Sequence, residues 1–413
     1  MFYNLGIHIL RGLLKFLSIF NDKIKKGVDG RKETFEILNS KIDPYEEKVW
    51  FHCASLGEFE QGMPVFESIR KEYPQVQIIL SFFSPSGYEI RKDTPIADII
   101  VYLPLDTPKN ARRWVSTINP KLTIFVKYDI WPNYLLELKR RKLPSVLISA
   151  RFREEQMYFQ WFGGKLKKGL KSFEHIFLQD MESEVLLKKV GYKNTIVSGD
   201  TRFDRVYNRL SSSTSLPWLE NFKEEKRLVV FGSTWPEDEN LIFQLISDLH
   251  DKPIKFLIAP HEIDEKHISN VLAGLRFPTL LYSDIKDEEN DKFPSKILIL
   301  DTIGQLAKTY SYADIAYVGG AVGKTGLHNI LEPAVFGLPI LIGPNHSKFP
   351  EALTLVSKGG VLSFQNYSEL KERITSLMDN MAYRKQIGEI NKKFVDNSKG
   401  AVIQILDHIR IYF

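Results

Sequence analysis

Short apolar segments alternate with segments of helical period along most of this chain, and this alternation restricts the fold more than any other feature. Each apolar segment is rich in Ile, Val, Leu or Phe, and several are bounded by Pro or Gly. Apolar strands separated by helices are typical of a parallel β-sheet that helices cover on both faces. The strands predicted in the first half of the chain are 49–53, 77–83, 98–102, 122–126, 145–149, 176–178 and 195–197.

The alternation stops at a polar segment, SSSTSLP at residues 211–217, and then begins again, which indicates a linker between two α/β domains. We predict an N-terminal helical region over 1–40, a first domain over 41–210, a second over 218–380 and C-terminal helices over 381–413 that can cross back to the first domain. The charged segment 284–292 is predicted to be a surface loop. The strands predicted in the second domain are 228–231, 255–258, 279–282, 297–300, 315–318 and 339–342.

Two parallel α/β domains imply a cleft between them, and ligands of such sheets bind outside the carboxyl ends of the strands. The single cysteine, Cys53, excludes an intramolecular disulfide and fits a reducing compartment. A formal net charge of +5 favours an anionic partner. Since no nucleic-acid-binding motif is evident, we favour a membrane surface or a phosphate-bearing substrate over nucleic acid.

The first 20 residues are mainly apolar, but Arg11 and Lys15 interrupt them, so the segment is a poor candidate for a helix that spans a bilayer. On a helix, five large apolar residues share one face: Leu5, Ile9, Leu13, Phe16 and Phe20. Basic residues follow at Lys23, Lys25, Lys26, Arg31 and Lys32. We predict a helix that lies in a membrane interface with its basic flank on anionic headgroups; the alternative is a terminal helix packed on its own domain.

The first predicted strand runs into Ser55, Gly57 and Glu58 at the start of a helix. Small residues let a ligand approach the backbone, and amides at a helix start suit an anion. The carboxylate of Glu58 is placed to take a proton from a hydroxyl nucleophile, although an acid in a first helical turn also interacts favourably with the helix dipole.

Two other strands of the first domain end in charged residues. Lys127 and Asp129 follow the strand at 122–126 and precede Trp131 and a helix that begins at Pro132. Arg151 follows the strand at 145–149, and arginine suits phosphate or carboxylate. Local ion pairs are the alternative reading of these residues.

In the second domain, polar turns follow two strands and dense glycine turns follow a third. The turn formed by Gly232, Ser233 and Thr234 offers donors to a phosphate, and His261 ends the next strand. The segment 317–344 then combines glycine turns with a polar helix start, which can hold a phosphate, and a glutamate that can accept hydrogen bonds from a ribose. Its candidate donor-binding residues are Gly320, Gly326, His328, Asn329 and Glu332.

These segments, taken in order, resemble the bacterial 3-deoxy-D-manno-octulosonic acid (Kdo) transferases over residues 1–380. The turn ending in Glu58 matches the A-S-x-G-E motif of that family, and residues 131–133 match W-P-N. Residues 198–204 resemble V-x-G-x-x-K-F-D, 232–234 match G-S-T and 328–333 match H-N-x-L-E-P. The family often has Glu where this chain has Lys127, and residues 153–155 also depart from its pattern, so the contacts with the acceptor can differ here.

The resemblance implies a GT-B-type fold of two Rossmann-like domains whose parallel sheets face a central cleft. It implies an inverting transfer of Kdo from CMP-Kdo to a hydroxyl of a lipid A precursor, with Glu58 as the general base and no protein-bound metal or other cofactor. The expected location is the cytoplasmic face of the bacterial inner membrane.

Other functions remain open from the residues alone. Non-hydrolysing sugar-nucleotide 2-epimerases share this architecture, but they have no need of an apolar N-terminus with a basic flank. Another lipid-directed glycosyltransferase, or a membrane-associated nucleotide-binding module without catalytic activity, would also fit the pattern.

Overall fold

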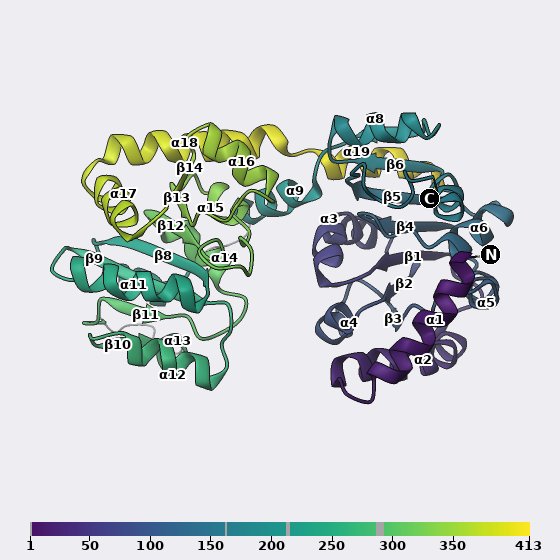
Figure 1. Ribbon diagram of the computed structural model, residues 1–413, viewed down its shortest axis with the longest axis horizontal. Coiled ribbons are helices and arrows are strands. Elements are labelled where there is room, and N and C mark those ends of the chain that lie inside the picture. Colours follow the sequence, from purple (N-terminus) through teal and green to yellow (C-terminus); the bar gives the residue numbers. More distant parts are fainter. Residues whose placement is uncertain (1, 162, 212–214, 286–292) are drawn as a thin grey trace. The chain divides into compact units, whose positions relative to one another are not determined.

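The computed structural model describes residues 2–161, 163–211, 215–285 and 293–413, and these form two compact units (Figure 1). Unit 1 comprises Met1–Arg205 and Lys399–Phe413, and unit 2 comprises Val206–Ser398. The chain therefore leaves unit 1 before residues 211–217, where we placed the linker, and returns to it for its last residues. Of that predicted linker, residues 212–214 lie outside the described part of the chain.

The sheet of unit 1 has seven strands in the order β3-β2-β1-β4-β5-β6-β7, and all of its neighbouring pairs are parallel. Every residue of the interior strand β1 is buried. A strand covered on both faces needs apolar side chains throughout, which explains the continuous apolar segments of the sequence. The strands are β1 (Lys48–Cys53), β2 (Gln77–Phe82), β3 (Ile99–Tyr102), β4 (Leu122–Val126), β5 (Ser145–Ala150), β6 (His175–Leu178) and β7 (Thr195–Val197).

Helices cover both faces of this sheet. One core contains Trp50 with Leu38, Trp114 and Tyr134 from three helices, and the other contains Phe51 with Phe59 and Ile405. Alternate residues of one strand thus serve the two faces. The helices of unit 1 are α1 (Phe2–Leu17), α2 (Asp22–Lys41), α3 (Leu56–Glu72), α4 (Pro85–Arg91), α5 (Pro108–Ile118), α6 (Pro132–Arg140), α7 (Gly164–Leu170), α8 (Met181–Lys189) and α19 (Ala401–Ile409), which the 3₁₀ turn η3 (Arg410–Tyr412) follows.

Unit 2 repeats the plan with the strand order β10-β11-β9-β8-β12-β13-β14, again with parallel pairs. Its strands are β8 (Arg227–Thr234), β9 (Ile254–Pro260), β10 (Thr279–Leu281), β11 (Ile297–Ile299), β12 (Ile315–Val318), β13 (Ile340–Ile342) and β14 (Val361–Ser363). Helix α9 (Thr201–Asn208) and the 3₁₀ turn η1 (Arg209–Ser211) carry the chain into it. Its other helical elements are α10 (Pro217–Lys223), α11 (Pro236–Leu249), α12 (Glu265–Gly274), α13 (Tyr282–Ile285), α14 (Leu306–Thr309), η2 (Tyr310–Tyr312), α15 (Leu331–Ala334), α16 (Pro350–Ser357), α17 (Tyr367–Asp379) and α18 (Met381–Ser398).

The predicted α/β class with two parallel sheets is confirmed, and all thirteen predicted strands are present with shifts of a few residues at their ends. Strand β14 was not predicted, because its three residues follow Gly359 and Gly360 and form no long apolar run. The surface loop predicted at 284–292 is wrong at its start, where residues up to Ile285 belong to α13; the remainder, 286–292, lies outside the described residues.

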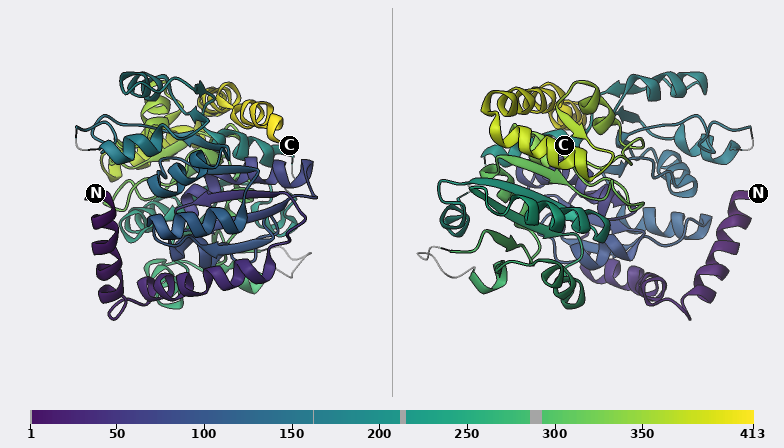
Figure 2. Two further views of the ribbon diagram at one scale, coloured as in Figure 1. Left: turned by 90° about the vertical axis from the view of Figure 1, so that its right-hand side faces the viewer. Right: turned by 60° about the vertical axis from the view of Figure 1, so that its left-hand side comes forward.

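Helix α1 lies along the outside of unit 1, and the chain turns sharply into α2 at its end (Figure 2). Ile7 of α1 is buried, and the hydroxyl of Tyr3 donates a 2.8 Å hydrogen bond to Asp106. The five apolar residues predicted to share a face are all exposed, from 49% for Leu13 to 73% for Phe20. Within the described residues, no helix is both long enough and apolar enough to cross a bilayer.

Candidate functional site

Glu58 lies in the first turn of α3, directly after the carboxyl end of β1. Its side chain is largely buried, with 8% of the residue exposed. Ser55, the residue that caps α3, does not bond to the helix backbone, because its hydroxyl donates to the Glu58 carboxylate instead. A Cβ atom added to Gly57 would meet only the Ser55 hydroxyl, at 3.8 Å, so this turn has open space above its backbone.

Trp131 and Asp129 meet at an imidazole that sequence reasoning missed, His52 of β1. The Trp131 indole donates a 2.9 Å hydrogen bond to Nε2 of the fully buried His52, and Nδ1 lies 3.1 Å from the carbonyl oxygen of Ser81. Asp129 Oδ2 lies 3.1 Å from the same Nε2. Because Nε2 accepts the indole proton, it has none to donate, and this buried carboxylate oxygen has no hydrogen-bond donor within the described chain.

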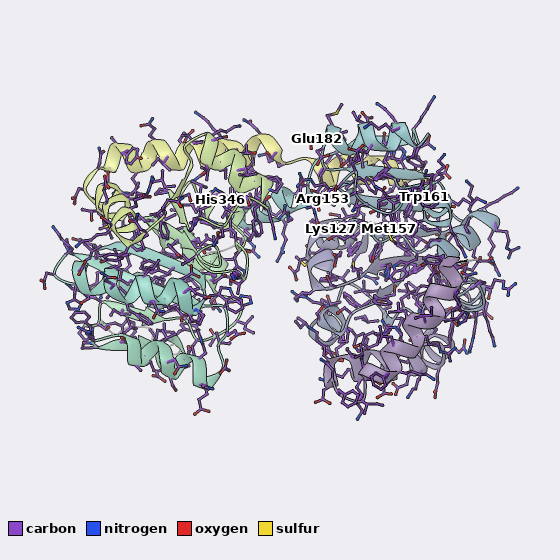
Figure 3. All side chains as sticks on the ribbon, viewed as in Figure 1. Lys127, Arg153, Met157, Trp161, Glu182 and His346 are labelled. Carbon is purple, nitrogen blue, oxygen red and sulfur yellow. The ribbon has the colours of Figure 1, made fainter. Side chains whose placement is uncertain are left out.

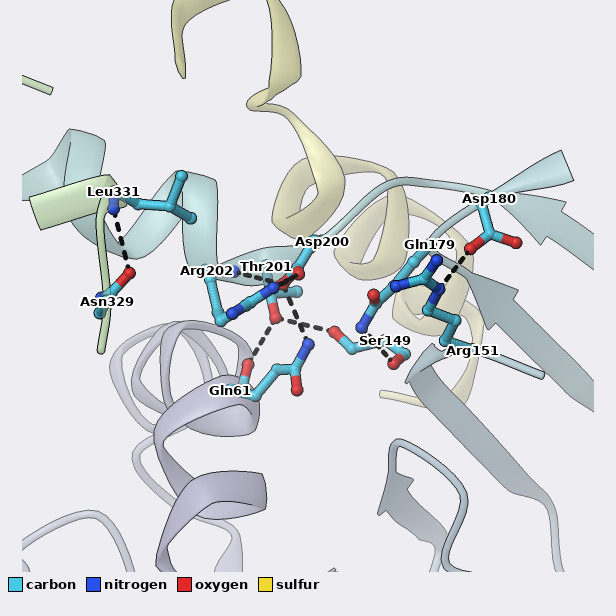
Figure 4. Close-up of polar contacts among 10 residues, drawn as sticks. All are labelled: Gln61, Ser149, Arg151, Gln179, Asp180, Asp200, Thr201, Arg202, Asn329 and Leu331. Carbon is cyan, nitrogen blue, oxygen red and sulfur yellow. Dashed lines mark hydrogen bonds and ion pairs between the residues drawn. The ribbon is translucent and has the colours of Figure 1, made fainter. Parts of the chain in front are cut away.

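The two basic residues predicted at this edge, Lys127 and Arg151, have other contact partners than Glu58. Lys127 stands with its ammonium nitrogen 5.5 Å from the centroid of the Tyr128 ring, and no ion pair with Asp129 is present among the described residues. Arg151 Nε lies 2.9 Å from Asp180 Oδ2, and both side chains are about one-third exposed (Figure 4). Arg151 would therefore have to share its guanidinium between Asp180 and a substrate oxygen.

A network of polar side chains joins the ends of β5 and β7 to helix α3 in unit 1 (Figure 4). Ser149 Oγ lies 2.7 Å from Thr201 Oγ1, which in turn donates to the carbonyl oxygen of Gln61 on α3. The amide of Gln61 donates a 2.9 Å bond to Asp200 Oδ1. This network fixes the segment 198–204, which carries part of the family resemblance, against helix α3.

Three residues with positive φ mark the strand ends: Lys127 at 69°, Ser149 at 52° and Ser233 at 54°. Residues other than glycine seldom adopt this left-handed conformation, and its cost is tolerated mainly where surrounding structure or function requires it. Two lie in unit 1 and one in unit 2, each beside residues that the sequence singled out.

In unit 2, residues 232–234 were predicted as a turn after a strand, but they are the last residues of β8, where the register with β9 shifts. Close packing holds this segment. A Cβ atom at Gly232 would lie 2.0 Å from the Tyr310 hydroxyl, so only glycine fits there. Thr234 is fully buried, and its hydroxyl donates a 3.0 Å bond to Glu239 on α11. Thr234 is thus a structural residue in this conformation, and of the three predicted donor-binding residues at this strand end only Ser233 is partly exposed.

Asp238, which sequence reasoning did not single out, organises the glycine turns of unit 2. It is fully buried in the first turn of α11. One carboxylate oxygen accepts the backbone N–H groups of Gly320 and Trp235 at 2.8 and 3.0 Å, and the other accepts the Tyr317 hydroxyl at 2.6 Å. Burial raises the pKa of Asp238, an effect that these three hydrogen bonds oppose.

Gly320 has φ 91° and therefore needs the conformational freedom of glycine. Since its N–H group bonds to Asp238, it is not available to a phosphate. The N–H group of Gly326, which has φ 101°, bonds to the carbonyl oxygen of Gly320 at 3.1 Å. Both predicted glycines thus shape the loop, and neither offers its amide directly to a ligand in this conformation.

His261 and His328 lie in one aromatic cluster with Trp235. The rings of His261 and Trp235 stack at a centroid distance of 4.7 Å, and the two imidazoles lie 4.4 Å apart. The indole of Trp235 donates a 2.9 Å bond to Nε2 of His328. Burial, with a smaller contribution from His261, lowers the pKa of His328 to about 4. His328 is therefore neutral at pH 7, with its proton on Nδ1.

The helix predicted after His328 and Asn329 is only one turn long, Leu331–Ala334, so a phosphate site at its N-terminus is a weaker prediction than the sequence implied. Asn329 Oδ1 accepts the N–H group of Leu331 at 3.1 Å (Figure 4). Glu332 Oε1 accepts a 2.9 Å hydrogen bond from Arg209 in an ion pair. The other carboxylate oxygen of Glu332 can accept a ligand hydroxyl. In the part of the chain that the structure describes, no group of three His, Cys, Asp or Glu residues is arranged to hold a metal ion.

Both a family model and individual relatives match this chain. Residues 29–205 match the family model described as 3-deoxy-D-manno-octulosonic-acid transferase (kdotransferase). A 3-deoxy-D-manno-octulosonic acid transferase of Haemophilus influenzae is 26% identical over 415 residues, which cover 97% of this chain and 95% of that protein. One of Aquifex aeolicus is 25% identical over 336 residues, which cover 80% of this chain and 86% of that protein.

Solved structures share the fold at lower identity. The UDP-GlcNAc 2-epimerase of Neisseria meningitidis has a TM-score of 0.61 and 16% identity, covering 88% of this chain and 99% of that one. MurG of Acinetobacter baumannii has a TM-score of 0.54 and 14% identity, covering 89% of this chain and 99% of that one. These neighbours confirm a GT-B-like fold of two Rossmann-like domains. The match of residues 29–205 to the family model, with relatives that span nearly the whole chain, shows a glycosyltransferase that is similar to the 3-deoxy-D-manno-octulosonic acid transferases.

Proposed function

We propose that this protein transfers Kdo from CMP-Kdo to a hydroxyl of a lipid A precursor with inversion at the anomeric carbon. The observation that carries the proposal is the pairing of Ser55 and Glu58 at the carboxyl end of β1, within the motif that matches the family base. Unit 1 supplies a carboxylate able to take a proton, and unit 2 supplies a glycine-rich edge with a neutral imidazole.

Glu58 suits the role of general base by its position and by its single neighbouring hydroxyl. The acceptor hydroxyl would give its proton to the carboxylate as its oxygen attacks the anomeric carbon. The bond between that carbon and the phosphate oxygen breaks, and CMP leaves with the bonding electrons. Attack from the face opposite the leaving group gives the inverted product, and the proton stays on Glu58 until solvent removes it.

His328 suits the role of a donor to the departing nucleotide. Because Nε2 accepts the Trp235 indole, Nδ1 carries the proton and can donate to a phosphate or carboxylate oxygen of the sugar nucleotide. Glu332, with one oxygen bound to Arg209, can accept a ribose hydroxyl with the other. No protein-bound metal enters the proposal.

The lipid acceptor requires access to a membrane, and the surface of unit 1 is suited to it. The exposed apolar face of α1 would lie in the bilayer interface. Met157 and Trp161, labelled in Figure 3, are 55% and 91% exposed in the same unit, and lysines of α7 follow in the chain. We propose that the protein acts at the cytoplasmic face of the inner membrane, bound by these surfaces.

The test is a transfer assay in vitro. The purified protein would be incubated with a tetra-acylated lipid A precursor and with CMP-Kdo generated in situ. The mass of the lipid product would be measured by mass spectrometry. A mass increase of one or more Kdo residues is expected. An arm without acceptor, using UDP-GlcNAc, tests the epimerase alternative that the fold similarity raises; isomerised donor there, with no lipid product, would reject the proposal.

A further inference from the structure

A pocket of about 660 Å³ opens in unit 1 between α1, α2 and the start of α5. Its lining holds no acidic residue, while apolar side chains such as Leu14, Val28 and Phe35 form part of its wall. Its basic lining residues are His8, Arg11, Lys15, Arg31, Lys32, Lys109, Arg112 and Arg113. So many like charges around one cavity repel one another, and they are most stable when an anion occupies it.

Most of these cations lack a carboxylate partner. Among the described residues, no ion pair involves Arg11, Lys15, Lys109, Arg112 or Arg113, whereas Lys32 pairs with Asp29 at 2.7 Å. The pocket therefore carries net positive charge.

Arg31 adds a partly buried charge to the lining of the pocket. Its guanidinium donates to the carbonyl oxygens of Leu103, Gly27 and Phe83, with no acid in contact. Burial lowers the pKa of Arg31 to about 10, which leaves it charged at pH 7. This arginine, expected from the sequence to face headgroups directly, is instead held by three backbone carbonyl oxygens in the wall of the pocket.

The N-terminus of α5 adds to the positive electrostatic potential of the pocket. Thr107 caps this 11-residue helix by accepting the N–H group of Asn110, and Thr107, Lys109 and Asn110 all line the pocket. Cations in a first helical turn are disfavoured by the helix dipole, whereas an anion there is stabilised. Lys109 therefore costs α5 stability unless an anion is present.

The pocket lies on the side of α1 away from its exposed apolar face. With 3.6 residues per turn, His8, Arg11 and Lys15 occupy a sector about 100° or more from the centre of the face that carries Ile9 and Leu13. A helix that lies with its apolar face in the acyl region holds its polar side at the level of the headgroups. Lipid phosphates would then reach the opening of the pocket.

We propose that this pocket binds the phosphodiester headgroup of an anionic glycerophospholipid, one lipid to each chain, and so fixes α1 at the membrane. The proposal rests on the membrane part of the proposed function but not on the transfer chemistry. Charge complementarity selects an anionic over a zwitterionic headgroup, since the ammonium of the latter would meet a wholly basic lining.

The test uses the full-length protein and isothermal titration with dihexanoyl phosphatidylglycerol below its critical micelle concentration, with dihexanoyl phosphatidylcholine as the comparison. The variant K109Q/R112Q removes two charges from the pocket; K71Q/K92Q removes two exposed lysines elsewhere in unit 1 and serves as the matched control. We expect the wild type and the control to bind phosphatidylglycerol with one site per chain. The pocket variant should bind it about 10- to 30-fold more weakly.

Equal binding by all three proteins, equal weakening in the control, or phosphatidylcholine binding as tight as phosphatidylglycerol binding would overturn the proposal. Transfer in detergent micelles separates it from the proposed function. K109Q/R112Q should keep the wild-type turnover and KM for the lipid acceptor, and a rise in that KM alone would assign the pocket to the acceptor phosphates instead. Absence of transfer by the wild type, with phosphatidylglycerol binding intact, would reject the transfer reaction and leave the pocket.

Discussion

The two units place the same hydrogen bond at the carboxyl edge of each sheet, but in different surroundings. In unit 1 the Trp131 indole donates to Nε2 of His52, and in unit 2 the Trp235 indole donates to Nε2 of His328, both at 2.9 Å. Each tryptophan precedes a proline that begins a helix, α6 or α11. His52 is fully buried beside the carboxylate of Asp129, whereas His328 lies beside a second imidazole.

This difference indicates that the two imidazoles have different roles. In unit 1 the imidazole serves as an internal brace, with both ring nitrogens engaged, and the edge presents carboxylates. In unit 2 the imidazole has one engaged nitrogen and one free to donate, and the edge is built from glycines. A carboxylate edge can take a proton from an alcohol, and an imidazole N–H group on an edge shaped by glycines can donate to an anion. The predictions below test that contrast.

The largest effect is expected for Glu58→Gln. If unit 1 supplies the general base, turnover should fall by about 10²- to 10⁴-fold, which corresponds to about 3–5 kcal/mol in the activation free energy. CMP binding, measured by titration, should be unchanged. Glu67→Gln, an exposed glutamate on the same helix, is the matched control and should turn over normally. Turnover of E58Q within threefold of the wild type would remove Glu58 as the base.

The next effect is expected in unit 2, for Asp238→Ala. The change leaves the buried Tyr317 hydroxyl and two backbone N–H groups without an acceptor, so the free energy of unfolding should fall by about 2–4 kcal/mol. CMP affinity should fall as well, because the turn at Gly320 loses its anchor. Asp248→Ala, at the end of the same helix in an exposed ion pair with Lys371, should cost less than about 1 kcal/mol.

Urea unfolding and CMP titration of the two variants measure this difference. Equal destabilisation, or full CMP affinity in D238A, would show that the glycine turns hold their shape without the carboxylate.

The sequence predicted the fold well because its signal is strong: both sheets are buried on two faces, and their strands are therefore continuously apolar. Strand β14 was not predicted, since only Val361 and Leu362 of its three residues are buried. The predicted helical region over 1–40 was not divided into two helices. In α2 only Gly27, Thr34 and Leu38 are buried, so its apolar face is too narrow to stand out from a basic segment.

The site was harder to predict, because side chains that brace a site give weak sequence signals. His52 stands within an apolar strand and resembles a core residue, and Asp238 resembles an ordinary acid in a first helical turn. Glycines 320 and 326 were noticed, but their amides turned out to bond within the loop. The repeated Trp-Pro pair is the signal that could have identified both imidazoles, since each tryptophan has an N–H group that needs a buried acceptor.

The smallest effect concerns pH and the imidazole of unit 2. The pKa of His328 is lowered to about 4 from an ordinary value of 6.5. Between these values the unfolded chain binds a proton that the folded chain does not. Stability from this group is therefore constant above pH 6.5, falls as the pH falls from 6.5 to about 4, and levels off below that. The full loss is of the order of 3 kcal/mol, at 1.36 kcal/mol for each pKa unit.

His328→Gln should remove this dependence. We expect the urea midpoint of the variant to change less than that of the wild type between pH 6.5 and 4.5. His261→Gln should have an intermediate effect on this pH dependence. The His261 imidazole lowers the pKa of His328, but by less than burial does. An identical pH dependence in the wild type and H328Q would show that His328 takes up its proton in the folded state as readily as in the unfolded one. The neutral donor proposed for unit 2, and with it the contrast between the two edges, would then be lost.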